Sequence, residues 1–167
     1  MKKIGLMSDT HSYLDPQIFE VFKDCDEIWH AGDIGTAELA QQIANFKPLK
    51  AVFGNIDNKA IQLLYPEHLY FELEEVGVLM IHIAGSLPRY NTKTKALIDL
   101  YRPHLLICGH SHILKVQPDH VNNCLYINSG ACGVEGWHKV KTVLRFELAE
   151  GHLQNMEAVE MGERAKL

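Results

Sequence analysis

Short apolar segments alternate with amphipathic stretches through the first third of the chain. The segments Lys3–Ser8, Glu27–Ala31 and Leu49–Phe53 are bounded by polar residues, which predicts three buried strands. Between them, apolar residues recur at helical spacing over residues 18–22 and 39–46, which predicts two amphipathic helices. Strands that alternate with helices, each strand ending in a polar tip, indicate an α/β core.

Residues typical of helix starts support these assignments. Asp15 followed by Pro16 predicts the start of the first helix, and Thr36 is a candidate cap for the second. Asn91 can cap a third helix that runs through Lys95–Tyr101.

The second half of the chain is richer in strands. Strands are predicted at about Leu69–Leu73, Val76–Ile83, Leu105–Cys108, Leu114–Gln117, Leu125–Asn128, Val140–Glu147 and His152–Val159. The run of strands late in the chain predicts a second sheet packed on the first. Since no repeat, low-complexity stretch or linker interrupts the pattern, residues 1–167 are predicted to form a single domain.

Composition narrows the class of protein. The 167 residues are 47% hydrophobic and 22% charged, as in an ordinary soluble domain. With 16 basic and 21 acidic residues the net charge is -5, which predicts no dedicated nucleic-acid-binding surface. No apolar run approaches the roughly 20 residues that cross a bilayer, and the start lacks the pattern of a signal peptide, so we predict a cytoplasmic protein without membrane contact. A homo-oligomer remains open.

Polar tips follow five of the apolar segments. They are Asp9-Thr10-His11, Gly32-Asp33, Gly54-Asn55, His82 and Gly109-His110-Ser111-His112. Because ligands in α/β folds bind beyond the carboxyl ends of strands, these tips are expected to converge. Carboxylate, imidazole and amide donors suit Mn²⁺, Zn²⁺, Fe²⁺ or Ni²⁺, whereas Ca²⁺ prefers oxygen ligands. Glycine before Asp33, Asn55 and His110 is expected to permit a sharp turn where a Cβ would crowd a metal or phosphate.

In this order, together with Asn128-Ser129-Gly130-Ala131, the tips resemble the motifs of the calcineurin-like metallophosphoesterases, in particular the small single-domain bacterial and archaeal phosphodiesterases. The resemblance implies an α/β (α+β) fold: a four-layer α/β/β/α sandwich of two packed mixed β-sheets flanked by helices. It also implies two divalent metal ions, for which we predict Mn²⁺ with Ni²⁺, Zn²⁺ and Fe²⁺ as alternatives. By motif, one metal is held by Asp9, His11, Asp33 and His112, and the other by Asp33, Asn55, His82 and His110.

Such a centre predicts hydrolysis of small phosphodiesters. Two metals with a bridging hydroxide can supply the nucleophile and stabilise an in-line displacement. The amide of Asn55 is predicted to be catalytic as well as a ligand, because its NH₂ group can donate to a phosphoryl oxygen. Position 56 is isoleucine where many larger relatives have a histidine that protonates the leaving group, which favours diesters or good leaving groups. Asp57 is predicted to support the site by orienting either His11 or a neighbouring loop.

Other residues and functions remain open at this point. Arg89 lies in a polar loop and is predicted to contact substrate, with a solvated loop as the alternative. His30 is predicted to be a structural histidine inside a strand. The alternative functions are a phosphomonoesterase of the same superfamily and a non-catalytic scaffold, like a eukaryotic retromer subunit of this fold that has lost several metal-binding histidines. The four histidines of the tips argue against the scaffold.

Overall fold

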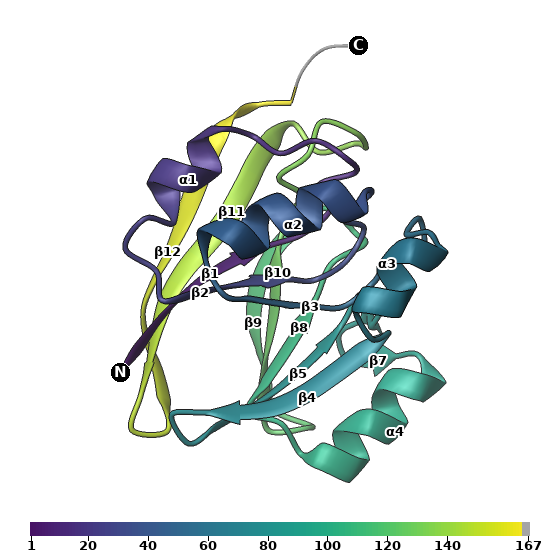
Figure 1. The fold of residues 1–167 in the computed structure, drawn as a ribbon. Coiled ribbons are helices and arrows are strands. Elements are labelled where there is room, and N and C mark those ends of the chain that lie inside the picture. The colour runs from purple at the N-terminus through teal and green to yellow at the C-terminus, as the bar shows by residue number, and fades with distance from the viewer. Residues whose placement is uncertain (165–167) are drawn as a thin grey trace.

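Two mixed five-stranded sheets form the centre of the molecule in the computed structural model, which describes residues 1–164 (Figure 1). The first sheet has the order β12 (His152–Glu163), β11 (Val140–Ala149), β1 (Lys2–Met7), β2 (Glu27–His30) and β3 (Leu49–Ala51). The second has the order β4 (His68–Leu73), β5 (Val76–Ile81), β8 (Leu105–Cys108), β10 (Cys124–Ser129) and β9 (Leu114–Asp119).

Helices cover the outer faces of both sheets. The helices are α1 (Gln17–Val21), α2 (Ala37–Phe46), α3 (Lys59–Leu64) and α4 (Thr92–Tyr101). Buried side chains of α1, α2 and α3 pack with the first sheet, and those of α4 pack with the second (Figure 1). The predicted four-layer α/β/β/α sandwich is therefore confirmed. No helix among residues 1–164 is long and apolar enough to cross a membrane.

The two sheets meet in an apolar core. The ring of Trp29 from β2 packs edge-to-face against Phe146 of β11 and Phe71 of β4, with ring centroids 5.6 and 5.0 Å apart. These contacts bury aromatic surface between the layers. Since this core holds the sheets together, it also fixes the strand ends of one sheet relative to those of the other.

The assignment of the last strands to a second sheet was wrong. Strands β11 and β12 extend the first sheet, because β11 pairs antiparallel with β1, for example Ile4 with Phe146. The second sheet is instead built from the middle of the chain, between residues 68 and 129. Alternating apolar residues predict that a strand exists, but the partner across a long sequence separation is set by packing.

Several element boundaries differ from the predicted ones. Helix α3 was missed because it is short and buries only Ile61, so the sequence carries no apolar stripe; Asn58 caps it by accepting from the Ile61 N–H at 3.2 Å. The hairpin of β6 (Gly85–Ser86) and β7 (Arg89–Tyr90) was missed because each strand has only two residues. Strand β5 ends at Ile81, two residues before the predicted end. Asn91 caps α4, which begins at Thr92 and ends at Tyr101, as predicted.

Thr36 caps α2 as predicted, and this contact gives a test of local stability. Its hydroxyl accepts the N–H of Leu39 at 3.2 Å, which satisfies one of the free donors at the helix start. Thr36→Ala should lower the free energy of unfolding by about 1 kcal/mol, or about 2–4 °C in Tm. Thr36→Ser keeps the hydroxyl acceptor, so its free energy of unfolding, measured in the same denaturant titration, should stay near that of the parent. Equal losses in both variants would contradict the capping role.

Candidate metal centre

The carboxyl ends of parallel strands from both sheets bring the predicted polar tips together. Asp9 follows β1 and Asp33 follows β2 in the first sheet, while His82 follows β5 and His110 follows β8 in the second. Asn55 follows β3. Two groups of donor atoms result, each with all its atoms within 4.8 Å of one another. The first group consists of Asp9, His11 and His112, and the second of Asp33, His82 and His110.

Asp9 presents one free carboxylate oxygen to the first group. Its Oδ2 accepts hydrogen bonds from the Ser8 hydroxyl at 2.6 Å and from the His110 N–H at 3.2 Å. Its Oδ1 is buried, makes no hydrogen bond within residues 1–164, and lies 3.2 Å from Nε2 of His112 and 3.9 Å from Nε2 of His11. A buried carboxylate oxygen that faces two imidazole nitrogens is arranged to bind a cation.

Asp33 lies between the two groups. Its Oδ2 is 3.3 Å from Nε2 of His11 and 3.1 Å from Nε2 of His82. Its Oδ1 accepts the N–H of Ile56 at 3.1 Å, which orients the carboxylate. One carboxylate therefore faces both groups, as the bridging position inferred from the sequence requires.

The remaining donors of the second group converge on the Asn55 amide. The Oδ1 atom of Asn55 lies 3.2 Å from Nε2 of His82 and 3.0 Å from Nδ1 of His110. Nδ1 of His82 lies 2.8 Å from the carbonyl oxygen of Ala31. Because a carbonyl can only accept, this contact assigns the proton of neutral His82 to Nδ1 and leaves the Nε2 lone pair directed into the site.

The residues present fit two divalent cations. Asp9 Oδ1 and His11 Nε2 are buried without hydrogen-bond partners in the described chain, and a metal ion would satisfy both. The mixed oxygen and nitrogen donors match borderline ions such as Mn²⁺, Ni²⁺, Zn²⁺ or Fe²⁺. Of the seven predicted ligands, six belong to the two donor groups and Asn55 adjoins the second.

The carboxylates and imidazoles also shift one another's titration. Contact with Asp33, followed by that with Asp9, raises the pKa of His11 to about 10. Burial by itself raises the pKa of Asp33, but the contacts with His11 and His82 outweigh it and hold that pKa well below its usual range. Binding of a metal to this site is therefore expected to release a proton from His11.

Metal affinity is expected to depend on pH. His11 keeps a proton up to about pH 10 in the metal-free chain, whereas coordination needs a free Nε2 lone pair. The affinity for Mn²⁺ should therefore fall as the pH falls, by up to about tenfold per pH unit for one displaced proton. Calorimetric titration in two buffers of different ionisation enthalpy measures the proton release. Equal affinities at about pH 6.5 and about pH 8.5 would contradict this coupling.

Asp57 connects the loops that carry Asp33 and Asn55. Its Oδ2 accepts from the N–H groups of Gly54 at 2.7 Å and Ile34 at 3.1 Å, and its Oδ1 accepts from Gly35 at 2.8 Å. Of the two roles expected from the sequence, orientation of a neighbouring loop is the one observed, and no hydrogen bond between Asp57 and His11 is found in residues 1–164. A single buried carboxylate therefore sets the spacing of two loops.

The glycines before the ligands follow the prediction only in part. Gly32 has a φ of 101°, so the turn before Asp33 uses glycine as expected, whereas Gly54 and Gly109 have no such positive φ. Asp9, Asp33 and His110 themselves have φ values of 55°, 55° and 70°. A Cβ at Gly54 would collide with the carboxylate of Asp33, and one at Gly109 would lie 2.7 Å from Oδ2 of Asp9. At both positions the absence of a Cβ leaves room for the side chains of Asp33, Ser8 and Asp9.

His30 is structural, in agreement with the prediction. Its Nδ1 accepts the N–H of Gly32 at 3.1 Å, so its Nε2–H donates to the Thr10 hydroxyl at 3.0 Å. The Thr10 hydroxyl in turn donates to the carbonyl of Ile34 at 2.8 Å. Complete burial lowers the pKa of His30 to about 4, so the ring is neutral and braces the loops after β1 and β2.

Asn128 supports the loop that carries His110 and His112, a role that the sequence did not reveal. Its amide group donates to the carbonyl of Gly109 at 2.9 Å and to the hydroxyl of Ser111 at 3.0 Å, and its oxygen accepts the N–H of Gly130 at 3.0 Å. The sequence analysis identified the motif Asn128–Ala131 but assigned no function to Asn128. The contacts fix the segment that carries His110 and His112.

A loop after β10 flanks the first group of donors. Oε2 of Glu135 lies 3.6 Å from Nδ1 of His11, and the ring of His138 packs edge-to-face on His112 with centroids 5.2 Å apart. Trp137 between them is 98% exposed. The sequence gives Glu135 no distinguishing motif, because a single carboxylate in a polar loop carries no pattern.

Arg89 is not brought into the site. It is exposed on β7, and its side chain makes no hydrogen bond or ion pair with residues 1–164. The neighbouring Tyr90 turns inward and donates to Oδ2 of Asp119 at 2.8 Å. Contact between Arg89 and substrate therefore stays a prediction.

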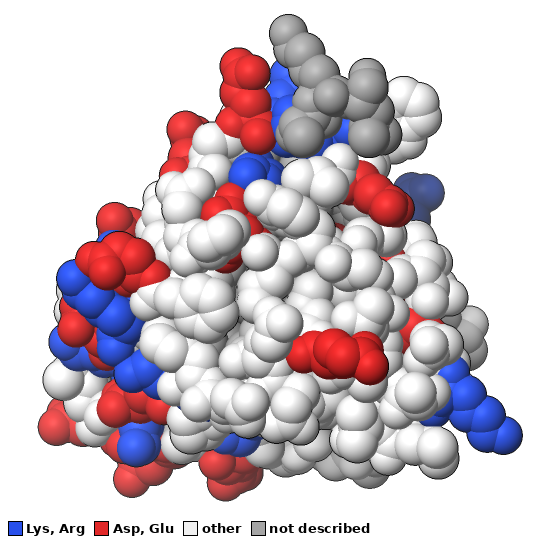
Figure 2. Space-filling view, turned by 45° about the horizontal axis from the view of Figure 1, so that its top comes forward, with Lys and Arg blue, Asp and Glu red and all other residues white. Residues whose placement is uncertain are grey.

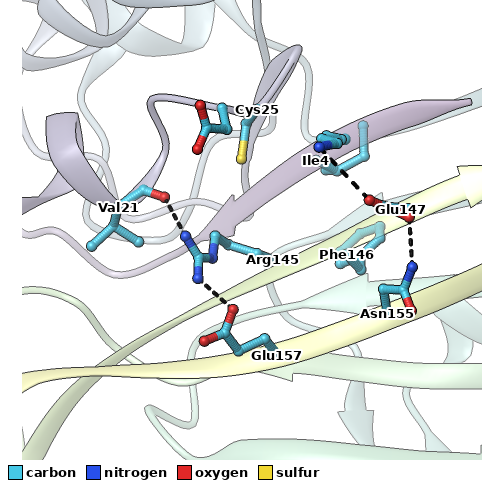
Figure 3. Close-up of a pocket in the computed structure, with 10 residues that line it drawn as sticks. Ile4, Val21, Cys25, Arg145, Phe146, Glu147, Asn155 and Glu157 are labelled. Atoms are coloured by element: carbon cyan, nitrogen blue, oxygen red, sulfur yellow. Dashed lines mark hydrogen bonds and ion pairs between the residues drawn. The ribbon is translucent and has the colours of Figure 1, made fainter.

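A separate cavity of about 200 Å³ lies beside the first sheet, away from the metal centre (Figure 3). Arg145 donates there to the carbonyl of Val21 at 3.1 Å and pairs with Glu157, while Asn155 donates to Glu147 at 2.7 Å. Arg145, Glu157, Glu147 and Asn155 are thus engaged in contacts within residues 1–164. Among the described residues, the groups of three or more donors that could hold a metal lie at the metal centre and not in this cavity.

The sandwich and the paired donor groups define a metal-binding phosphoesterase fold. The calcineurin-like phosphoesterase superfamily domain matches residues 1–151. The chain therefore belongs to this superfamily. It is 31% identical over 115 residues to the probable metallophosphoesterase of Methanothermobacter thermautotrophicus, an alignment that covers 65% of this chain and 66% of that protein.

Solved structures with little sequence identity share the fold. A novel archaeal phosphodiesterase superposes with a TM-score of 0.74 at 20% identity, over 95% of this chain and 99% of that chain. Wild-type Vps29 of Entamoeba histolytica complexed with Zn²⁺ gives a TM-score of 0.70 at 15% identity, over 95% and 98%. At these identities the likeness establishes the fold but not the activity, which has to be argued from the site.

Proposed function

We propose that this chain is a metal-dependent phosphodiesterase that hydrolyses small phosphodiesters at a dinuclear centre. In the reaction a water oxygen bonds to phosphorus while one ester oxygen leaves as an alcohol. The observation that carries the proposal is the pair of buried atoms without hydrogen bonds, Asp9 Oδ1 and His11 Nε2, next to a carboxylate, Asp33, that faces both donor groups.

Bound divalent cations would lower the pKa of a water molecule and neutralise charge on the phosphate. One cation would be held by Asp9, His11, Asp33 and His112. The other would be held by Asp33, Asn55, His82 and His110. We propose Mn²⁺, with Ni²⁺, Zn²⁺ and Fe²⁺ as alternatives, because the donor set is mixed.

Asn55 and Ile56 determine what the protein itself adds to the chemistry. The Oδ1 atom of Asn55 points to His82 and His110, so its NH₂ group is available to donate to a phosphoryl oxygen. Ile56 is 44% exposed and has no proton to give to a leaving group. This arrangement favours diesters and good leaving groups over monoesters of poorly acidic alcohols.

The surface is consistent with a small substrate. On the face shown in Figure 2, uncharged residues cover most of the centre, with an acidic patch just to the right of it, and most of the basic side chains lie toward the margins. Among residues 1–164, this face shows no continuous basic tract for a nucleic acid. We also propose a cytoplasmic location, because the four cysteines, Cys25, Cys108, Cys124 and Cys132, are free and buried.

The second candidate function is a protein-binding scaffold, which the likeness to Vps29 favours. A phosphomonoesterase of the same superfamily is the third. The clustered histidines, with His82 and Asp33 buried and 3.1 Å apart, support metal binding in this chain. A metal titration that shows neither bound metal nor affinity would favour the scaffold.

Hydrolysis of bis(p-nitrophenyl) phosphate tests the proposal. Purified protein with Mn²⁺ or Ni²⁺ should release p-nitrophenolate, and a chelator should abolish the reaction because the ligands alone supply no nucleophile. The monoester p-nitrophenyl phosphate, which has the same leaving group, is the matched control and should react more slowly. A faster monoester reaction would indicate the phosphomonoesterase instead.

A further inference from the structure

Two cavities of different size adjoin the second group of donors. The larger, of about 560 Å³, is bordered by Asn55 and His82 and extends toward the start of α4 at Thr92. The smaller, of about 220 Å³, is bordered by His110 and extends along the β6 hairpin at Ser86. Both therefore open beside the atoms that we propose to hold the reacting phosphate.

One side chain separates the cavities. Ile83 lines both of them and is 39% exposed. The segment that carries it is fixed by Asn91, whose N–H donates to the carbonyl of Ala84 at 3.0 Å and whose side-chain amide donates to the carbonyl of Ile83 at 2.7 Å. Two hydrogen bonds from Asn91 thus hold the backbone that places Ile83 between the cavities.

The larger cavity suits an uncharged group. Phe53 and Ile81 supply apolar walls, and the ammonium group of Lys93 is neutralised by Glu67 at 2.6 Å. Its volume lies within the range of about 300–1,000 Å³ that is typical of small-molecule sites, whereas the smaller cavity falls below that range. A phosphodiester has two substituents, and two cavities beside one phosphate position match that composition.

We infer that the substrate is an asymmetric phosphodiester, with a nucleoside-sized uncharged substituent in the larger cavity and a compact substituent in the smaller one. This inference rests on the proposed phosphodiesterase function and goes beyond it by naming the substrate class. Thr92 and Ser86 are exposed residues of the two cavities and bind no metal in our assignment. They are therefore suitable positions for blocking each cavity separately.

Two diesters with the same leaving group test the assignment. Thymidine 5′-(p-nitrophenyl) phosphate needs both cavities, whereas methyl p-nitrophenyl phosphate can place its only large group in either. Thr92→Trp and Ser86→Trp should each lower kcat/KM for the thymidine diester by about tenfold and change that for the methyl diester by less than about twofold. Leu100→Trp, which adds the same ring at an exposed position of α4, should change neither.

Binding of thymidine 5′-monophosphate gives a readout independent of turnover. Thr92→Trp should weaken it by about tenfold, and Ser86→Trp by less than about twofold. Parallel changes for both diesters, or unchanged nucleotide binding in Thr92→Trp, would overturn the two-cavity assignment while leaving the phosphodiesterase intact. If the parent protein hydrolyses no diester with Mn²⁺ or Ni²⁺, the proposed function itself is overturned, and the asymmetric diester class with it.

Discussion

Asp33→Asn is expected to lower kcat/KM for bis(p-nitrophenyl) phosphate by about 10³-fold or more at saturating Mn²⁺. The carboxylate oxygen of Asp33 that faces both donor groups would lose its charge, and an amide is a weak substitute as a shared ligand. The loss corresponds to about 4 kcal/mol of transition-state stabilisation. The measurement is a steady-state assay over a range of Mn²⁺ concentrations.

The substitution isolates the charge of Asp33 from its structural role. An asparagine at this position can still accept the N–H of Ile56 through its Oδ1 atom, so the loop keeps its anchor. Asp99→Asn, an exposed position on α4, is the matched control and should retain parent activity. If Asp33→Asn kept more than about a tenth of the activity, the bridging role would be wrong.

Asp57→Ala is expected to damage both stability and metal binding. It removes the acceptor of three backbone N–H groups, those of Gly54, Ile34 and Gly35. Leaving these donors unsatisfied should cost about 3 kcal/mol or more in the free energy of unfolding. Because the loops of Asp33 and Asn55 lose their connection, affinity for Mn²⁺ should fall by about 10- to 100-fold.

Asp57→Asn separates positioning from general destabilisation. Its single carbonyl oxygen can still accept from two of the three donors, while its NH₂ group would face the third. Unfolding titrations and Mn²⁺ titrations should therefore place this variant between the parent and Asp57→Ala. An Asp57→Ala protein that is destabilised but binds Mn²⁺ as tightly as the parent would show that Asp57 acts on stability alone.

The local features of the fold were predictable because they depend on neighbouring residues. The first three strands, the amphipathic α2 and the caps at Thr36 and Asn91 follow from apolar spacing and from side chains that bind nearby N–H groups. Helix α3 escaped prediction because its buried face consists of Ile61 alone.

Asp57 shows the limit of such an argument within the site. Its place after Gly54-Asn55 indicated a supporting role, but the sequence left two partners open. The choice depends on the side chain lying between the backbone of Gly54 and that of Ile34, about twenty positions away in the chain. Contacts across that separation form only when strands have paired.

The sequence by itself determined which side chains are candidate metal donors and the family that the chain resembles. The order of aspartate, asparagine and histidine tips carried that information, because the identity of a donor atom is a local property. Only the tertiary structure decided that β11 joins β1 in the first sheet, that Asp33 faces both donor groups, and that two unequal cavities flank Ile83. Each of these depends on the packing of segments far apart in the chain, which no local pattern specifies.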